Sequence, residues 1–206
     1  NQPDDPRGFQ DFNAVKTRFE VPCHCVCGNH DIGNTPTAAS LARYRKEVGK
    51  DYYSLEHKGY TLVAANTQLW KEVVPGESEK HDRWFQEALA TAHRKKQPTL
   101  VCGHYPLFIG EASEEEGYYN IEPKKRSVIL GLFQETGVVA YLSGHAHTNF
   151  EHEFQGIRLV TSATTSRNFD GAPMGFRVWK VSADGTLEHS YVSVEGAKSP
   201  EQQSSP

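Results

Sequence analysis

Hydrophobic positions in the first part of the chain alternate between helical and strand-like spacing. The helical spacing predicts helices over residues 8–19, over 38–48 with Thr37 as N-cap, from Ser78 to the basic residues 94–96, and from Pro123 to a stop at Gly137. In the last of these, Val128, Ile129, Leu132 and Phe133 are expected to face inward. The strand-like runs cover residues 21–27, 51–57, 60–66, 99–102 and 138–142, with a turn at Lys58-Gly59. This alternation favours an α/β fold.

The last part of the chain changes character, because strand-like runs follow one another without helices between them. These runs cover residues 150–154, 157–162, 176–182 and 186–194, with turn signals at Gln155-Gly156 and Asp184-Gly185. The pattern predicts antiparallel hairpins. Residues 196–206 are rich in Ser, Gln and Pro, so we expect a disordered tail after one domain over residues 1–195.

Length and charge narrow the class of protein. With 206 residues the chain is long enough for one domain that needs neither a disulfide nor a structural metal, so a bound metal is expected to serve function. The net charge of −4 argues against a protein whose main ligand is a long nucleic acid. The chain has no apolar run long enough for a transmembrane span, and its first residues lack the basic and apolar regions of a signal peptide.

Three of the four cysteines, Cys23, Cys25 and Cys27, alternate along one predicted strand and so share one of its faces. A thiolate zinc site there is the weaker alternative, because structural zinc sites use paired Cys-x-x-Cys knuckles with a second cluster, and the sequence has none. We expect buried free thiols, which fit a reducing compartment, the cytoplasm.

Metal-binding residue types follow three predicted strands, each directly after a glycine. The motifs are Gly28-Asn29-His30-Asp31, Gly103-His104 and Gly144-His145-Ala146-His147. Ligands of open α/β sheets bind outside the carboxyl ends of strands, so the three loops are expected to meet in one crevice. Glycine permits the sharp turn that aims the next side chain over the sheet edge. Imidazole and carboxamide groups suit Fe, Zn or Mn.

Other polar residues are interpreted as background. The remaining six of the 10 histidines lack the strand-end glycine and are expected to be structural or exposed: His24, His57, His81, His93, His152 and His189. The acidic stretch over residues 111–116 favours a solvated loop over a substrate lid. Tyr118 and Tyr119, which follow it, keep the lid alternative open.

The order of the three motifs resembles the calcineurin-like metallophosphoesterase superfamily over about residues 1–194. The longer string over residues 28–37, with the segments 51–54 and 106–108 after it, is similar in particular to the CPPED type (calcineurin-like phosphoesterase domain-containing) of protein phosphatase. The resemblance implies a two-sheet β-sandwich flanked by helices in an α/β/β/α arrangement. It also implies two metal ions, Mn, Fe or Zn, that activate water, and a phosphorylated substrate, either a phosphoprotein or a small phosphoester.

Carried over residue by residue, the resemblance implies that Asn29, His104 and His145 bind one metal ion and that His147 binds its neighbour. It implies that His30 is the acid beside the leaving group, with Asp31 as its orienting partner. The alternative for Asp31 is a cap of the following turn.

Two further motifs of the family do not occur in the chain. They are an Asp-x-His or Asp-x-Gln at the end of the first strand, and the Gly-Asp that supplies the carboxylate bridging the metals. We expect them, with the first strands of the fold, upstream of Asn1. The leading hypothesis is therefore a metal-dependent phosphoric-ester hydrolase. The alternatives are a phosphodiesterase for small nucleotides, and a non-catalytic binding module without the bridging carboxylate.

Overall fold

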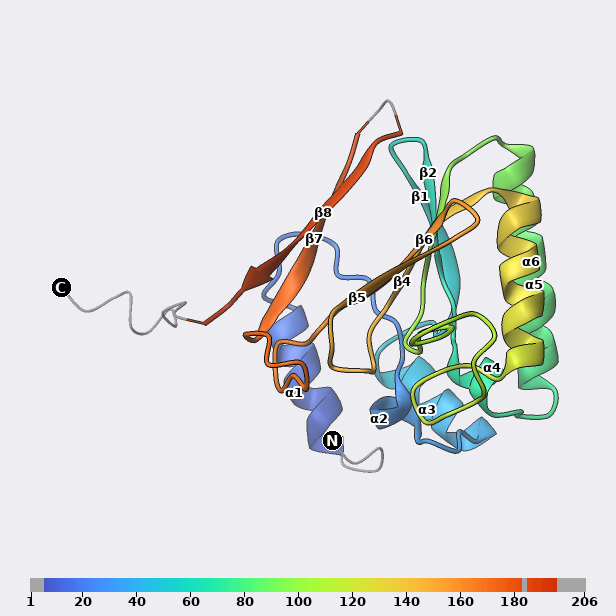
Figure 1. The fold of residues 1–206 in the computed structure, drawn as a ribbon. Coiled ribbons are helices and arrows are strands. Elements are labelled where there is room, and N and C mark those ends of the chain that lie inside the picture. Colours follow the sequence, from blue (N-terminus) through green and yellow to red (C-terminus); the bar gives the residue numbers. More distant parts are fainter. Residues whose placement is uncertain (1–5, 183–184, 196–206) are drawn as a thin grey trace.

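A computed structural model describes residues 6–182 and 185–195 of the chain (Figure 1). Helices and strands are interspersed up to β4, and strands in pairs follow. In chain order the elements are α1 (Pro6–Lys16), α2 (Asn29–Ile32), α3 (Ala38–Glu47), β1 (Tyr53–His57), β2 (Tyr60–Ala64), α4 (Gln68–Lys71), α5 (Glu77–Arg94), β3 (Thr99–Cys102), α6 (Pro123–Thr136), β4 (Val138–Ser143), β5 (Phe150–Phe154), β6 (Ile157–Thr161), β7 (Gly175–Val181) and β8 (Leu187–Ser193).

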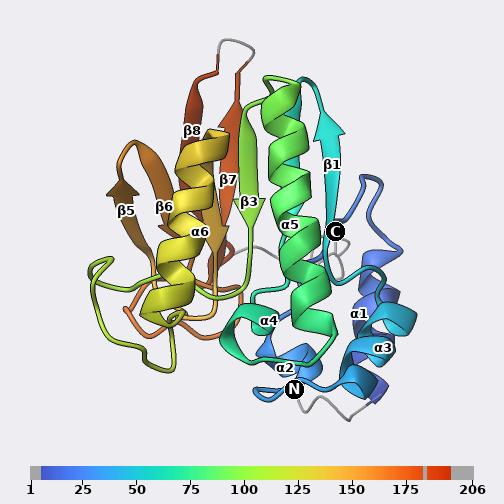
Figure 2. The same ribbon diagram turned by 90° about the vertical axis from the view of Figure 1, so that its right-hand side faces the viewer.

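A six-stranded mixed sheet forms the centre of the fold, in the order β1-β2-β3-β4-β6-β5. Strands β2, β3, β4 and β6 run parallel, and β1 and β5 pair antiparallel at the two edges. Helices α5 and α6 cover one face of this sheet (Figure 2). Their Phe85 and Phe133 pack with Val63, Val101 and Tyr141 of the strands in the main core. Because parallel strands end at the same edge, the loops after β3 and β4 lie close together.

The hairpin of β7 and β8 covers the opposite face of the large sheet (Figure 1). Trp179 of β7 and Leu187 of β8 pack against Leu100 and Ala140 of that sheet. The structure therefore confirms the expected α/β fold with two sheets and flanking helices. Helix α1 packs through Phe9 against Tyr44 of α3.

Most predicted elements are confirmed within a few residues, because their end signals act locally. Thr37 caps α3 as expected, and its hydroxyl accepts the Ser40 N–H at 3.1 Å. Helix α6 begins at Pro123 and ends at Gly137, which has the left-handed φ of 72° that glycine tolerates. The hairpin between β1 and β2 turns at Lys58-Gly59, as predicted.

Two local predictions are wrong. Ser78 lies inside the first turn of α5, whose N-cap is Gly76, and its hydroxyl instead accepts the Val74 N–H at 3.0 Å. Val128 is 52% exposed, because the buried stripe of α6 runs through Arg126, Ile129, Leu130 and Phe133 and leaves Val128 outside it.

The predicted strand over residues 21–27 does not form. The segment has no regular secondary structure. One hydrogen bond connects it to β1, in which the Tyr53 hydroxyl donates to the Cys25 carbonyl at 2.9 Å. A strand needs a neighbour for its backbone N–H and C=O groups, and no strand of residues 6–182 or 185–195 pairs with this segment. The cysteines are free, as expected, but only Cys27 of the three is buried.

Two other expectations concern the ends of the domain and the membrane. In the part of the chain that the structure describes, no helix has the length and apolarity to cross a membrane. The predicted tail over residues 196–206 lies outside the described residues, and the domain boundary at residue 195 stays a prediction.

Candidate metal centre

The strand-end motifs meet at one edge of the large sheet. His104 follows β3, His145 follows the parallel β4, and Asn29 opens the short helix α2 after Gly28. Figure 2 shows β3 running toward the edge where α2 and α4 lie. The structure thus brings Asn29, His104 and His145 together, as their positions in the motifs predicted.

The Nε2 of His104 lies within hydrogen-bond distance of one polar atom from each of the other two side chains. The Nε2 of His104 is 2.8 Å from Oδ1 of Asn29 and 3.0 Å from Nδ1 of His145. Asn29 and His145 are buried, and His104 is half-buried. We call Asn29, His104 and His145 the polar triad.

The protonation of the polar triad follows from its neighbours. The Nε2 of His145 lies 3.2 Å from the backbone oxygen of Tyr118, which only accepts, so Nε2 carries the proton and Nδ1 is bare. The Nε2 of His104 therefore donates, and its one proton is shared between Oδ1 of Asn29 and Nδ1 of His145. The proton on Nε2 of His104 is thus hydrogen-bonded to a lone pair of Asn29 and to a lone pair of His145.

Glycines allow this close approach at two of the three motifs. A Cβ on Gly28 would lie 2.8 Å from the His104 ring, and a Cβ on Gly103 would lie 2.4 Å from the methyl group of Thr67. A side chain at either position would therefore overlap its neighbour. The hydroxyl of Thr67 also accepts the backbone N–H of His104 at 3.1 Å, which fixes the loop after β3.

The third motif is built differently from the expectation. A Cβ on Gly144 would meet open space, so glycine is not needed there for close approach. His145 and His147 themselves take the left-handed conformation, with φ of 64° and 53°. This conformation costs roughly 1–2 kcal/mol for a residue with a Cβ, so the surrounding packing must hold both turns.

Burial lowers the pKa of both imidazoles in the polar triad. The pKa of His104 falls to about 3, first through burial and then through the nearby charge of the protonated His145, His30 and His147. Burial likewise lowers the pKa of His145 to about 4, although the hydrogen bond to Tyr118 acts in the opposite direction. Both rings are therefore neutral at pH 7, which is the form that binds metal ions.

The polar triad fits a metal ion in its donor atoms and in their spacing. Ligands held at about 2.1 Å from one ion lie about 3.0 Å apart in octahedral geometry and about 3.4 Å apart in tetrahedral geometry. The Nε2 of His104 lies 2.8 and 3.0 Å from the other two triad atoms, which is near the octahedral value. If a metal cation replaced the shared proton, it could bind Oδ1 of Asn29, Nε2 of His104 and Nδ1 of His145 through their lone pairs. Among the described residues, no group of three or more His, Cys, Asp or Glu is placed to hold a metal. The polar triad contains only two residues of these types, and its third donor is the amide oxygen of Asn29. It is the candidate metal site.

His147 makes no hydrogen bond with the polar triad. Its Nδ1 donates to the Arg167 carbonyl at 2.5 Å, and its ring stacks on Phe169 with the ring centroids 5.1 Å apart. These contacts leave Nε2 as the nitrogen that is able to bind a metal. The assignment of His147 to a second metal ion stays a prediction.

The expected acid and its partner lie on α2. His30 is exposed, next to the buried Asn29. The Oδ2 of Asp31 accepts the Gly28 N–H at 2.7 Å, which caps the turn, and burial raises the pKa of the Asp31 carboxyl. The structure thus supports the alternative that Asp31 is a cap. The role of His30 as an acid, with Asp31 as its orienting partner, stays a prediction.

Sequence reasoning missed the groups that orient the polar triad. The Nδ2 of Asn29 donates to Oδ1 of Asn34 at 2.8 Å and to the hydroxyl of Tyr118 at 3.2 Å, which turns the amide oxygen of Asn29 toward His104. The signal in the sequence was the tyrosine pair after the acidic stretch, which suggested a lid and not an orienting group. The acidic stretch itself is an ordered loop, tied down for example by the ion pair of Glu116 with Lys71.

His81 is one of the histidines that were expected to be structural rather than metal-binding. It is fully buried, and its Nε2 accepts the Asn66 N–H at 3.1 Å. Burial lowers the pKa of His81, which keeps the ring neutral as this hydrogen bond requires. The structure confirms its structural role.

Known proteins resemble the chain over most of its length. Residues 3–149 match the family model described as Calcineurin-like phosphoesterase. The human serine/threonine-protein phosphatase CPPED1 is 32% identical over an alignment of 179 residues, and the match covers 85% of this chain and 57% of the human protein. The chain therefore spans little more than half the length of the curated relatives that it matches.

Two solved structures share the fold. GAP50, the anchor in the inner membrane complex of Plasmodium, superposes with a TM-score of 0.66 at 17% identity and covers 96% of this chain and 71% of its own. A dimetal phosphatase from Danio rerio has a TM-score of 0.54 at 13% identity, over 75% of this chain and 65% of its own. Since the matched residues 3–149 include all three strand-end motifs, the chain belongs to the calcineurin-like phosphoesterase family.

Proposed function

We propose that the protein is a metal-dependent phosphoric-ester hydrolase for phosphomonoesters, with phosphoserine and phosphothreonine residues of proteins as its substrates. The observation that carries this proposal is the polar triad, in which an amide oxygen and two neutral imidazole nitrogens converge at 2.8 and 3.0 Å. Membership of the family supports the same reaction class, and so does the human relative, which is a serine/threonine-protein phosphatase.

In this proposal, Asn29, His104 and His145 hold one metal ion and His147 holds a second. When bound, a dinuclear centre of Mn, Fe or Zn supplies activated water for in-line attack on phosphorus. The chain's own residues keep both imidazoles neutral and orient the amide of Asn29. His30 donates a proton to the departing oxygen of the substrate from its exposed position on α2.

The bridging carboxylate has to come from elsewhere. No Asp or Glu side chain within residues 6–182 and 185–195 forms a hydrogen bond or ion pair with the polar triad. In this proposal, the Gly-Asp motif that the resemblance places upstream of Asn1 supplies it. The assays therefore compare the 206-residue chain with a form extended upstream of Asn1.

The test compares His104→Gln with the matched control His57→Gln, since His57 is an exposed histidine at the end of β1. We expect His104→Gln to lower both Mn²⁺ binding and hydrolysis of p-nitrophenyl phosphate by about 100-fold or more, and the control to change neither. An extended form that binds two metal ions but hydrolyses neither this ester nor phosphopeptides would refute the proposal and favour the binding module. Faster cleavage of bis(p-nitrophenyl) phosphate would favour the phosphodiesterase.

A further inference from the structure

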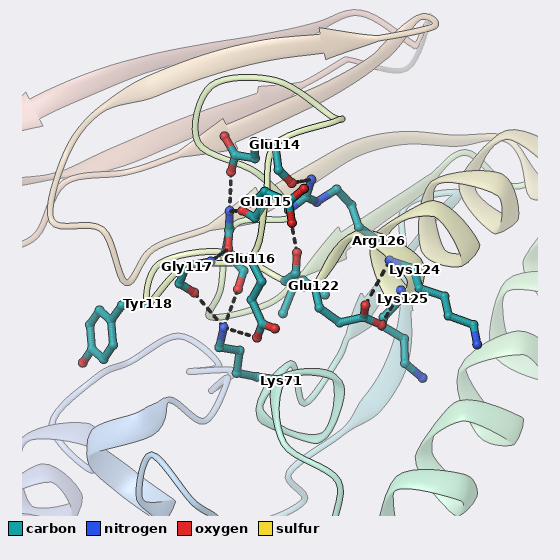
Figure 3. Close-up of polar contacts among 12 residues, drawn as sticks. Lys71, Glu114, Glu115, Glu116, Gly117, Tyr118, Glu122, Lys124, Lys125 and Arg126 are labelled. Atoms are coloured by element: carbon teal, nitrogen blue, oxygen red, sulfur yellow. Dashed lines mark hydrogen bonds and ion pairs between the residues drawn. The ribbon is translucent and has the colours of Figure 1, made fainter.

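A buried arginine holds the base of the loop between β3 and α6, which we call the acidic loop (residues 109–121; Figure 3). Arg126 is fully buried, and its guanidinium donates to four backbone oxygens. Its Nε donates to Leu107 at 2.8 Å, its Nη1 to Ala112 and Glu114 at 2.8 and 2.7 Å, and its Nη2 to Ile121 at 2.7 Å. The guanidinium thus joins both ends of the acidic loop to α6.

A lysine from α4 holds the tip of the acidic loop. The Nζ of Lys71 donates to the Glu116 carboxylate at 2.6 Å and to the carbonyls of Gly117 and Asn120 at 2.7 and 3.0 Å. Lys71 is only 11% exposed, so water competes weakly for these contacts. The two carbonyls lie on either side of Tyr118 and Tyr119 in the sequence. Lys71 therefore fixes the backbone that carries both tyrosines.

Tyr118 leaves this loop on the side of the polar triad and contacts two of its members. Figure 3 shows the phenol ring pointing away from Arg126. Its hydroxyl accepts from Nδ2 of Asn29 at 3.2 Å, and its carbonyl accepts from Nε2 of His145 at 3.2 Å. The first contact turns Oδ1 of Asn29 inward, and the second keeps Nδ1 of His145 bare. These are the two atoms that the triad offers to a metal ion.

We propose that Tyr118 is a positioning residue that presents Asn29 and His145 to the metal ion, and that Lys71 holds Tyr118 in the place where it does so. The inference rests on the proposed function, because it assigns a role in the same site. Partners of this kind fix the tautomer and orientation of metal ligands, and their loss typically lowers metal affinity 10- to 100-fold. The acidic loop then serves the site through its anchored backbone rather than as a moving lid.

The first experiment reads the imidazole tautomers of the metal-free protein by ¹⁵N NMR at neutral pH. We expect His145 to carry its proton on Nε2 in the wild type, and to shift toward a mixture of tautomers in Lys71→Gln. The matched control is Lys124→Gln, because Lys124 is an exposed lysine of α6 outside these contacts. A Nε2 proton that is equally retained in Lys71→Gln would contradict the role of Lys71.

The second experiment measures Mn²⁺ affinity by calorimetry. Tyr118→Phe should weaken binding about 10-fold. The control Tyr119→Phe removes a hydroxyl that makes no hydrogen bond within the described residues, from a ring 5.5 Å from that of His145, and should leave the affinity unchanged. If Tyr118→Phe binds Mn²⁺ like the wild type, the positioning of Asn29 by the Tyr118 hydroxyl is refuted while the proposed function stands. An extended wild-type protein that binds no Mn²⁺ would overturn both.

Discussion

Gly28 is the position where one added methyl group tests the geometry of the metal centre. In Gly28→Ala the new Cβ would lie 2.8 Å from Cε1 and Nδ1 of His104 and 3.0 Å from its Nε2. The backbone at Gly28 has φ −120° and ψ 179°, which alanine adopts without strain. The whole effect of the substitution therefore falls on the His104 ring.

The expected magnitude follows from two opposing contributions. Overpacking of this kind costs about 1–3 kcal/mol. Replacing glycine by alanine where the backbone permits it stabilises a protein by about 0.4–1 kcal/mol, because the unfolded chain loses freedom. The net loss is about 1 kcal/mol, or about 2–4 °C in Tm for a chain of this length. Because the ring must move away from Asn29 and His145, Mn²⁺ affinity should fall about 10-fold.

Thermal unfolding and calorimetric titration of Mn²⁺ measure the two effects separately. The matched control is Gly131→Ala in the middle of α6, where the Cβ meets open space. It should raise stability by about 0.5–1 kcal/mol and leave Mn²⁺ affinity unchanged. A Gly28→Ala protein with wild-type stability and affinity would show that the Gly28–His104 contact does not define the site.

Three further predictions concern packing and charge. Arg126→Met should destabilise the protein by about 3 kcal/mol or more in urea unfolding, because buried carbonyls lose their partner; a loss below about 1 kcal/mol would contradict this. Gly103→Ala should cost more than Gly28→Ala, since its Cβ would lie 2.4 Å from Thr67; an equal Tm would count against it. Since burial lowers the pKa of His104 to about 3 and of His145 to about 4, the folded metal-free protein binds fewer protons than the unfolded chain below pH 6.5. Its stability should therefore fall from pH 6.5 to pH 4, by up to about 1.4 kcal/mol per pH unit for each imidazole, and a flat profile would refute the burial argument.

Local residue chemistry determined most of the secondary structure. The Thr37 cap and the Pro123 and Gly137 boundaries of α6 involve contacts within about one turn of the helix, so the sequence contains all the information they need. The strand over 99–102 was likewise predicted with its observed bounds. The sequence also placed the triad residues at strand ends, and the parallel pairing of β3 with β4 then brought two of those ends together.

Tertiary structure decided the features that depend on distant partners. Residues 21–27 have the composition of a strand, but a strand exists only where another strand accepts its backbone hydrogen bonds. Val128 is apolar, yet the direction from which the sheet meets α6 left it exposed. Tyr118 reaches the polar triad from a loop that Lys71 of α4 and Arg126 of α6 anchor. The sequence by itself therefore determined which residue types reach the site, whereas the shared proton, the imidazole tautomers and the anchoring cations follow from long-range packing.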